Sequence, residues 1–287
     1  MTTLTALEAQ YAVANGRYSD DRVVVDRVGC GEQISAVPRV DGRVHVRHGF
    51  DSTHLDDDLA DRLAVSLTPV VKDAETFQSA FVGIVATSDR DTERAWRRFY
   101  ENSMNRISDG SRTGYVEVHR HAIELLEGQT SVLDLGCSFG FLALFLARTK
   151  IRTVAADANP ETVRLLARMS KRIGVALTVV RSDPRTVPLP SRSVSAVALL
   201  HVLEHTDRSV GDTLLSEALR IAESRVVVAV PYEARPTALY GHIRTFLPED
   251  LAAIGEQSGW HYQVHDRHGG WLLLERPSAD QAEAHAR

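Results

Sequence analysis

The sequence predicts an α/β protein with a doubly wound, seven-stranded and mostly parallel sheet, preceded by a small β-rich N-terminal accessory region. From about residue 112, strand-like and helix-like segments alternate, which is typical of a parallel sheet with helices on both faces. Near the C-terminus, two strand-like segments flank His268-Gly269-Gly270, which favours a closing hairpin and an antiparallel edge strand. Residues 21–90 instead alternate apolar and polar side chains in short runs, as small β-sheets do.

The alternating part of the chain gives its elements in order. The predicted strands are 132–135, 152–156, 176–180, 194–200 and 225–230, followed by the hairpin strands 262–266 and 271–275. The predicted helices are 141–149, 160–173 and 248–258. The last of these has Pro248 in its first turn and Gly259 just past its end, two residues that commonly begin and end helices.

The N-terminal part reads as a separate region. Predicted strands at 22–28, 33–40 and 43–48 are separated by glycine-containing turns, of which Asp41-Gly42 is a hairpin signal. We therefore expect a β-rich region that covers the substrate at 1–90, and a connecting helix and linker at 91–111. A cofactor-binding domain at 112–276 and a disordered tail at 277–287 follow. The aromatic side chains of the connecting helix, Trp96, Phe99 and Tyr100, are expected to pack against the sheet domain.

Composition limits the class of protein. The chain has 287 residues, 44% hydrophobic and 25% charged, with a net charge of −5, so it reads as globular and does not favour a nucleic-acid partner. Its two cysteines indicate a reducing compartment rather than a disulfide framework. No secretory signal or membrane-length apolar run is visible, so we expect a cytoplasmic protein; the oligomeric state is not predicted.

A glycine turn, Gly136-Cys137-Ser138-Phe139-Gly140, joins the strand 132–135 to the helix that begins at Phe141. Such a strand–turn–helix unit lets a ligand approach bare backbone near the N–H groups of a helix N-terminus. A dinucleotide site requires Gly-x-Gly-x-x-Gly, but Ser138 and Phe141 replace the second and third glycines. A phosphate-binding loop requires a lysine after its last glycine, and Phe141 follows instead.

Gly136-x-Ser138-x-Gly140 also fits the nucleophile elbow of α/β-hydrolases. In that interpretation His265 or His268 would serve as the base, and Asp207 or Asp250 as the acid of a triad. Asp134, two residues before the turn, has no role in an elbow, and no His-Gly-Gly oxyanion segment precedes the strand. The hydrolase therefore stays a distant alternative.

The segment Val132-Leu133-Asp134-Leu135-Gly136-Cys137-Ser138-Phe139-Gly140 resembles motif I of the class I S-adenosylmethionine-dependent methyltransferases. The resemblance implies a Rossmann-like fold and S-adenosylmethionine as the cofactor. It also implies that Asp134 holds the methionine ammonium and that the backbone of Gly136, Cys137, Ser138 and Gly140 lies against the ligand. Serine at the middle position is a departure that keeps the residue small. Cys137 is expected to contribute backbone only.

The resemblance continues along the chain. It implies that Asp157 binds the ribose hydroxyls, that Asp183 lies near the adenine amino group, and that Ala158 and His201 border the cofactor. Each acid also has a structural interpretation, because Asp157 could cap the next helix and Asp183 precedes a proline in a turn. The chain departs from the family at Ser195, where the fourth strand usually carries an acid.

The segment His201-Val202-Leu203-Glu204-His205 follows the fourth predicted strand and is close to the His-x-Leu-Glu-His segment of the same family. A hydroxyl acceptor needs a base, and histidine titrates near neutral pH, so His205 is the predicted base and His242 the second candidate. Glu204 could instead simply pair with a structural His205. No metal ligand set is predicted, because His45, His48 and His54 lack acids or cysteines grouped with them.

A second, narrower resemblance involves Phe99-Tyr100-Glu101-Asn102-Ser103 and Tyr240-Gly241-His242. These residues are similar to the actinobacterial methyltransferases that modify the glucose oligosaccharide of mycofactocin, a peptide-derived redox cofactor. The resemblance implies O-methylation of a sugar hydroxyl of that oligosaccharide. The alternatives are another small molecule or a glycolipid as acceptor, or a scaffold that binds the cofactor without catalysis.

Overall fold

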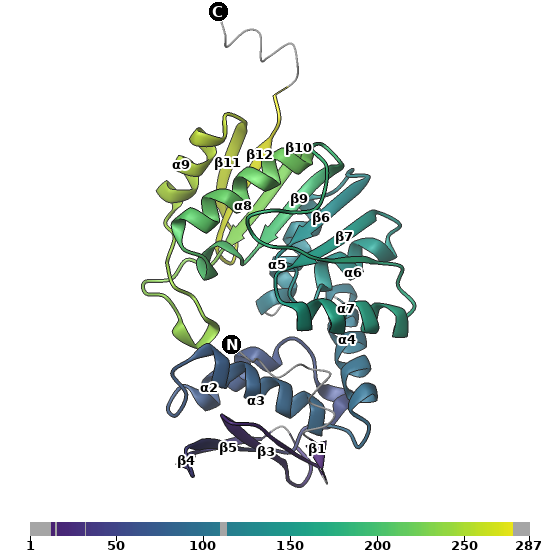
Figure 1. Ribbon diagram of the computed structural model, residues 1–287, viewed down its shortest axis with the longest axis vertical. Coiled ribbons are helices and arrows are strands. Elements are labelled where there is room, and N and C mark those ends of the chain that lie inside the picture. Colours follow the sequence, from purple (N-terminus) through teal and green to yellow (C-terminus); the bar gives the residue numbers. More distant parts are fainter. Residues whose placement is uncertain (1–12, 15, 32, 110–113, 278–287) are drawn as a thin grey trace, which may run out of the picture. The chain divides into compact units, whose positions relative to one another are not determined.

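The computed structural model describes residues 13–14, 16–31, 33–109 and 114–277 (Figure 1). The chain divides into two compact units that interleave along the sequence. Unit 1 contains residues 1–116, 164–175 and 237–241, and unit 2 contains residues 117–163, 176–236 and 242–287. Whether the predicted domain ranges fold independently stays a prediction. The tail predicted to be disordered lies, apart from Pro277, outside the described residues, as does the end of the predicted linker.

Unit 1 contains a small five-stranded sheet with the strand order β1-β2-β3-β5-β4 (Figure 1). Its strands are β1 (Val13–Ala14), β2 (Arg17–Ser19), β3 (Val23–Arg27), β4 (Ile34–Val40) and β5 (Arg43–His48). Strands β3 and β5 pair in parallel, and the other pairs are antiparallel. The predicted N-terminal sheet is therefore present.

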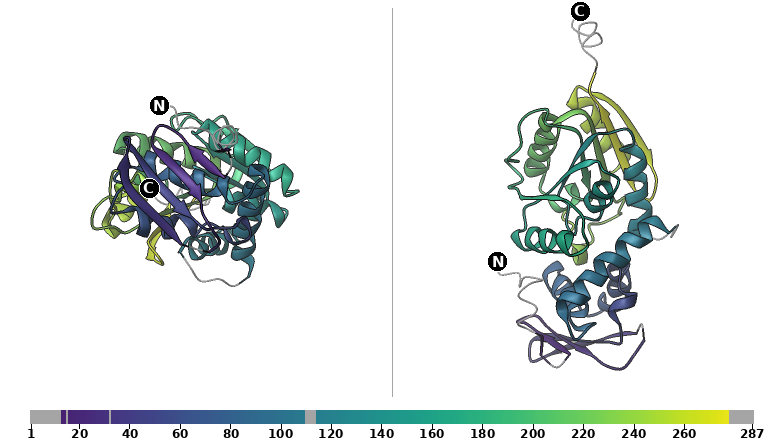
Figure 2. Two further views of the ribbon diagram at one scale, coloured as in Figure 1. Left: turned by 90° about the horizontal axis from the view of Figure 1, so that it is seen from below. Right: turned by 90° about the vertical axis from the view of Figure 1, so that its right-hand side faces the viewer.

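Unit 1 also contains the predicted connecting helix, α4 (Thr92–Ser108), and three helices that were not predicted. These three are η1 (Ser52–His54), α2 (Leu59–Leu67) and α3 (Ala74–Thr87). Helices α2 and α3 contact the sheet, and the views of Figure 2 show the helices on one side of it. The prediction of a purely β-rich region is thus incomplete. The buried side chains of Leu59, Leu63 and Leu67 recur every four residues, which is a helical rather than a strand period.

Helix α4 packs within unit 1, against α3 and η1. The Phe99 ring lies edge-on to Phe81 of α3, with 5.7 Å between ring centroids, and Trp96 and Tyr100 are also buried. Glu93 at the start of α4 forms ion pairs with Arg168 and Arg172. A helix of its own unit is thus one partner of Phe99. Packing of these aromatic side chains against the sheet domain stays a prediction.

Unit 2 is built on a seven-stranded sheet with the order β11-β12-β10-β9-β6-β7-β8. The strands are β6 (Ser131–Leu135), β7 (Arg152–Asp157), β8 (Thr178–Arg181), β9 (Val194–Leu200), β10 (Ala222–Val230), β11 (His261–Asp266) and β12 (Gly270–Glu275). All pairs from β10 to β8 are parallel, while β12 joins β10 and β11 in antiparallel register. This is the predicted doubly wound sheet with its antiparallel edge, so the fold class is confirmed.

Helices cover both faces of the large sheet (Figure 1). They are α5 (Gly114–Leu125) and α6 (Phe141–Arg148) on one face, and α8 (Arg208–Ile221) and α9 (Pro248–Ser258) on the other. A short helix, η2 (Leu203–His205), follows β9. Most of α7 (Pro160–Arg172) and all of the short helix η3 (Ala238–Tyr240) belong to unit 1. Alternate residues of the central strands pack on opposite sides: Val132 joins the core under α5 and α6, and Leu133 joins the core under α8 and α9. Helices α5 and α8 were not predicted. The sheet brings the ends of β6, β7, β8 and β9 to one edge, where a ligand binds in folds of this type.

Candidate active site

The glycine turn, defined as Gly136–Gly140, is fixed between β6 and β7 by backbone hydrogen bonds. The N–H groups of Gly136 and Cys137 both donate to the Ala156 carbonyl, at 2.8 and 3.0 Å. Gly136 has φ +80°, and a Cβ atom there would lie 2.5 Å from Cγ2 of Val202 in the loop after β9. Gly140 has φ +75° and begins α6 without a side-chain cap. The turn therefore has no room for a larger residue at its first position, and Gly140 gives the start of α6 no side-chain cap.

Asp134 lies on β6, two residues before the turn, and is only 4% exposed. Its carboxylate accepts a hydrogen bond from the Ala143 N–H in the first turn of α6, which partly replaces the missing cap. Burial raises the pKa of Asp134 to about 7, and the nearby Asp157 adds to the rise, although the Ala143 bond opposes it. A cationic group bound beside Asp134 would lower this pKa again. The site is therefore suited to a ligand ammonium.

Asp157 ends β7 and holds the glycine turn from the other side. Its Oδ2 accepts from the Ser138 N–H at 2.9 Å, and its Oδ1 accepts from the Asn159 N–H at 2.8 Å. The residue that caps α7 is Asn159, whose Oδ1 accepts from the Glu161 N–H at 2.9 Å. The helix-cap interpretation of Asp157 is therefore not what the structure has. Ala158, predicted to border the cofactor, is exposed directly after it.

Asp183 follows β8 and is exposed. Its Oδ1 accepts from the Arg185 N–H at 2.8 Å, and its carbonyl accepts from the Thr186 N–H at 3.0 Å. These bonds belong to a turn, as the structural interpretation has it, and they leave the other carboxylate oxygen for a ligand. Its role toward adenine stays a prediction.

The side chains of the turn do not form a nucleophilic centre. Burial raises the pKa of the Cys137 thiol well above its ordinary value, so the thiolate is disfavoured. His265 lies on β11, four strand spacings from β6, which is a lateral separation of roughly 19 Å. Asp207 and Asp250 cap α8 and α9 by accepting from the N–H groups of Val210 and Leu247. The triad required by the hydrolase alternative is therefore not assembled around Ser138.

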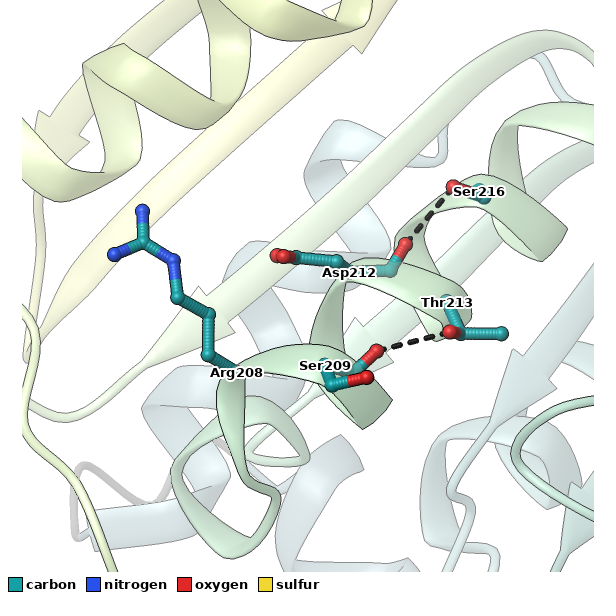
Figure 3. Close-up of a pocket in the computed structure, with 5 residues that line it drawn as sticks. All are labelled: Arg208, Ser209, Asp212, Thr213 and Ser216. Atoms are coloured by element: carbon teal, nitrogen blue, oxygen red, sulfur yellow. Dashed lines mark hydrogen bonds between the residues drawn. The ribbon is translucent and has the colours of Figure 1, made fainter.

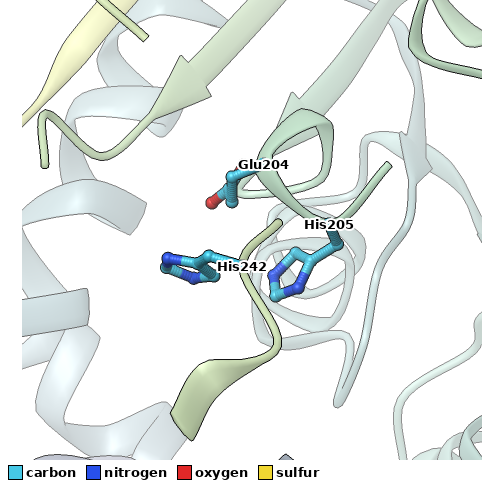
Figure 4. A group of neighbouring side chains, drawn as sticks. All are labelled: Glu204, His205 and His242. Atoms are coloured by element: carbon cyan, nitrogen blue, oxygen red, sulfur yellow. The ribbon is translucent and has the colours of Figure 1, made fainter. Parts of the chain in front are cut away.

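A second group of polar side chains follows β9, and we call Glu204, His205 and His242 the imidazole group (Figure 4). Glu204 and His205 belong to η2, whereas His242 comes from the segment after η3. One ligand atom from each residue lies within 4.8 Å of the other two. The two imidazole rings stand edge to face, with 4.8 Å between their centroids and an interplanar angle of 82°.

Hydrogen bonds dock the later segment onto η2. The Glu204 carbonyl accepts from the Ile243 N–H at 2.8 Å, and Arg244 Nε donates to the Leu203 carbonyl at 2.9 Å. The structure thus brings His242 to His205 from 37 residues further along the chain, which spacing alone does not indicate. His242 is buried, and its Nδ1 lies 2.7 Å from Oε2 of Glu233, a partner that the sequence analysis missed. Glu233 follows the end of β10, and this position at the carboxyl edge of the sheet could have indicated a functional residue.

The buried Glu204 pairs with the half-buried His201 beside this group. Glu204 is 0% exposed, and its Oε1 lies 3.0 Å from Nδ1 of His201. His201 has φ +54°, and its N–H donates to the Ala229 carbonyl at 2.9 Å. The Glu204 carboxylate therefore pairs with His201, whereas the structural alternative paired it with His205. A border role of His201 toward the cofactor stays a prediction.

A shallow depression on the outer face of α8 is lined by Arg208, Ser209, Asp212, Thr213 and Ser216 (Figure 3). All five residues come from this one helix. The hydroxyls of Thr213 and Ser216 donate to carbonyls one turn earlier, both at 2.9 Å. Their donor groups are used within the helix, so we assign this depression no role. Among the described residues, no helix has both the length and the apolar character needed to cross a membrane.

The fold and the glycine turn define an α/β protein whose candidate ligand site lies at the carboxyl edge of a parallel sheet. Residues 132–224 match the family model of a methyltransferase domain. The match includes the glycine turn, Asp157, Asp183 and η2 but ends before His242. The chain therefore carries a methyltransferase domain over these residues.

Solved structures with a similar fold include a SAM-dependent methyltransferase from Aquifex aeolicus. It is 17% identical, with a TM-score of 0.48, and the similarity covers 60% of this chain and 97% of that one. Magnesium protoporphyrin IX methyltransferase from Synechocystis PCC 6803, solved with bound SAH, is 14% identical with a TM-score of 0.48, covering 60% and 92%. The [4+2]-cyclase SpnF is 20% identical with a TM-score of 0.49, covering 60% and 85%. A comparison with curated protein sequences found no match.

Proposed function

We propose that this methyltransferase is a cytoplasmic O-methyltransferase whose acceptor hydroxyl binds at the imidazole group. The contact between Gly136 and Val202 is the observation that carries the proposal. Val202 directly precedes η2, so the glycine turn that receives the cofactor touches the loop that carries Glu204 and His205. A methyl donor and an acceptor held at these two places would meet at the same sheet edge, as in-line transfer requires.

The residues around the glycine turn fit S-adenosylmethionine. This cofactor supplies a methyl group bound to a positively charged sulfur. Asp134 offers a buried carboxylate for the ammonium, and the turn offers backbone at a position where no Cβ fits. Asp157, exposed Asp183 and the neighbouring Ala158 and His201 would contact the ribose and adenine. Because Asp157 also binds the Ser138 N–H, ribose binding and the shape of the turn are coupled.

The imidazole group fits a hydroxyl acceptor. A hydroxyl is a weak nucleophile at neutral pH and must lose its proton as the new C–O bond forms. His205 is exposed and so can meet an acceptor, while His242 is held by Glu233. We therefore assign His205 and His242 to the activation of the acceptor and Glu204 to the support of that centre.

For the acceptor itself, we propose a sugar hydroxyl of the mycofactocin oligosaccharide. The support is the resemblance of residues 99–103 and 240–242 to the methyltransferases that act on that glycan. In unit 1 these residues have structural partners: Asn102 donates to the carbonyls of Ser52, Thr53 and Leu55, and the Tyr240 hydroxyl lies 3.2 Å from Asp61. They would thus act by shaping unit 1 and the chain that leads to His242.

The proposal is tested with methyl-labelled S-adenosylmethionine and three acceptor pools: purified mycofactocin oligosaccharide, a small-molecule extract and a glycolipid extract. We expect label in the oligosaccharide as a base-stable methyl ether, located by mass spectrometry. Label only in another pool would replace the proposed acceptor and keep the O-methyltransferase. A base-labile methyl ester or an N-methyl product would refute O-methylation of a hydroxyl. Cofactor binding without transfer to any pool would favour the non-catalytic scaffold.

A further inference from the structure

We propose that Glu204, His205 and His242 bind one divalent transition-metal ion, which holds and activates the acceptor hydroxyl. One ligand atom of each residue lies within 4.8 Å of the other two, and the side chains converge in Figure 4. The inference rests on the proposed function, because it says how the imidazole group acts on a hydroxyl. It also replaces the expectation, drawn from the sequence, that no metal ligands are present.

The buried carboxylate of Glu204 is the first support for an ion. Its Oε1 faces His201, but its Oε2 has no hydrogen-bond partner among the described residues. A buried carboxylate oxygen without a partner destabilises a folded protein. A cation bound at Oε2 would satisfy this oxygen and explain why a fully buried glutamate lies here.

The bonding of His242 is the second support. Its Nδ1 lies 2.7 Å from Oε2 of Glu233, so Nε2 is the nitrogen on the side of the ring away from that carboxylate. A carboxylate bonded to the far nitrogen of a histidine is the usual arrangement around metal ligands, because it fixes the ring and raises its basicity. The backbone bond from Ile243 to Glu204 holds the two ligands in register.

His205 completes the set from the exposed side. Two imidazoles and one carboxylate, with a position left open, form the ligand set of catalytic metal sites. Imidazole ligands favour zinc, copper, iron or nickel over magnesium. Ligand atoms around a tetrahedral ion stand about 3.4 Å apart, so rotation of the exposed His205 ring would close the set.

The chemistry of such a centre is balanced without further reactants. The acceptor hydroxyl occupies the open position, and the ion lowers its pKa so that its proton passes to solvent. The oxygen lone pair then forms a bond to the methyl carbon. The carbon–sulfur bond breaks, its electron pair returns to sulfur, and the cationic sulfonium becomes a neutral thioether. No oxidation or reduction takes place.

A second group in the described residues, Asp56, Asp57 and Asp58, also brings three carboxylates together. The guanidinium of Arg106 already contacts Asp56, at 2.9 Å, and Asp58. Arg106, together with Arg62 at 3.5 Å from Asp56, offsets part of the negative charge of the cluster, and the cluster offers no nitrogen ligands. We propose no site there and use Asp57 as a control.

The test titrates the chelator-treated full-length protein with Co²⁺, whose visible absorption reports its ligands, and counts bound cobalt by elemental analysis. We expect one bound ion per chain. Glu204→Gln and His242→Ala should each lower the affinity by at least about tenfold, since each removes one of three ligands. Asp57→Asn and His261→Gln, a substitution of an exposed histidine on β11, should leave binding unchanged. Binding of S-adenosylhomocysteine shows that each variant is folded.

The outcomes separate this proposal from the function on which it rests. Absence of Co²⁺ binding, or equal binding by wild type and both ligand variants, overturns the metal site. Methyl transfer that continues unchanged after chelation also overturns it, while the O-methyltransferase stands. Transfer that chelation abolishes and Co²⁺, Mn²⁺ or Zn²⁺ restores supports it. Absence of methyl transfer to any acceptor, despite a bound ion and bound cofactor, refutes the proposed function instead.

Discussion

The glycine turn and the imidazole group lie at the ends of adjacent strands, β6 and β9, but they are built in different ways. The glycine turn is one continuous segment whose shape is set by backbone: three positive φ angles, at Gly136, Ser138 and Gly140, and two N–H groups on one carbonyl. The imidazole group is set by side chains from two segments, which backbone bonds to Glu204 and Leu203 hold together. We therefore expect added bulk to inactivate the glycine turn, and removal of single functional groups to inactivate the imidazole group.

The largest expected effect comes from Gly136→Val, which should abolish S-adenosylmethionine binding and turnover. The Cβ atom of the new side chain would lie 2.5 Å from Cγ2 of Val202, which is too close. A φ angle of +80° is also unfavourable for a β-branched residue. Isothermal calorimetry with S-adenosylmethionine checks the result. Gly128→Val is the matched control, because Gly128 has φ +79° and nothing within 4 Å of its Cβ position. It should lose stability but keep affinity. Unchanged affinity in Gly136→Val would contradict the position assigned to the cofactor.

His205→Ala should lower turnover by about 10²- to 10⁴-fold while the affinity for S-adenosylmethionine changes by less than about twofold. The reason is that His205 acts on the acceptor and not on the cofactor. Steady-state kinetics and calorimetry on the same preparation separate the two effects. His261→Gln serves as the control for a histidine on the same unit. A loss of cofactor affinity in proportion to the loss of turnover would show that His205 acts on the cofactor and not on the acceptor.

Substitution of Glu233 tests whether the imidazole group depends on a residue behind it. Glu233→Gln keeps the shape of the side chain but removes the charge that faces Nδ1 of His242. We expect a loss of about 10- to 100-fold in turnover and in metal affinity. Wild-type values for both would show that Glu233 is only a structural partner of His242.

The pH dependence of cofactor binding tests the buried carboxylate of the first region. Asp134 has a raised pKa of about 7, so it is mostly protonated at pH 6 and mostly ionised at pH 8. Because the ionised form attracts the ligand ammonium, affinity should rise about tenfold across this interval. The stability of the unliganded protein should run in the opposite direction. A carboxyl whose folded pKa is raised stabilises the fold at low pH, and that contribution is lost as the pH rises toward 7.

Asp134→Asn is the control for this dependence. It resembles the protonated carboxyl, so it should bind weakly at both pH values, and calorimetry should give a flat profile. A wild-type profile that is also flat, or one that falls with pH, would show that Asp134 does not meet the ammonium.

The same contrast explains what could be predicted from the sequence. The strands of the large sheet and the glycine turn follow from local patterns: apolar strands, small residues at the turn, and acids at strand ends. Helices α5 and α8 were missed because strands and turn signals dominated those parts of the pattern, although the buried residues of α8 recur at helical spacing. Helices α2 and α3 were missed because the β-rich interpretation of residues 21–90 rested on the strand-like patterns at 22–48.

The partners of the imidazole group could not be predicted, because they depend on tertiary structure. His205 was predicted as the base, with pairing to Glu204 as the structural alternative. In the structure the Glu204 carboxylate pairs with His201, and Glu233 reaches His242 from the end of β10. No local spacing encodes these contacts. They arise where the segment after η3 returns to η2, and only a folded chain shows that two histidines and a glutamate converge.

The smallest effect is expected at the residue whose sequence context looked most like a nucleophile. Ser138 has φ +48°, and its N–H donates to Asp157, while its side chain is exposed. Ser138→Ala should therefore change methyl transfer by less than about twofold. Ser138→Gly should act equally well or better, because glycine adopts a positive φ without strain. Neither variant nor the wild type should hydrolyse an activated ester such as p-nitrophenyl acetate. Esterase activity that Ser138→Ala destroys would show that the turn carries chemistry of its own, and the division between a backbone cofactor site and a side-chain acceptor site would fail.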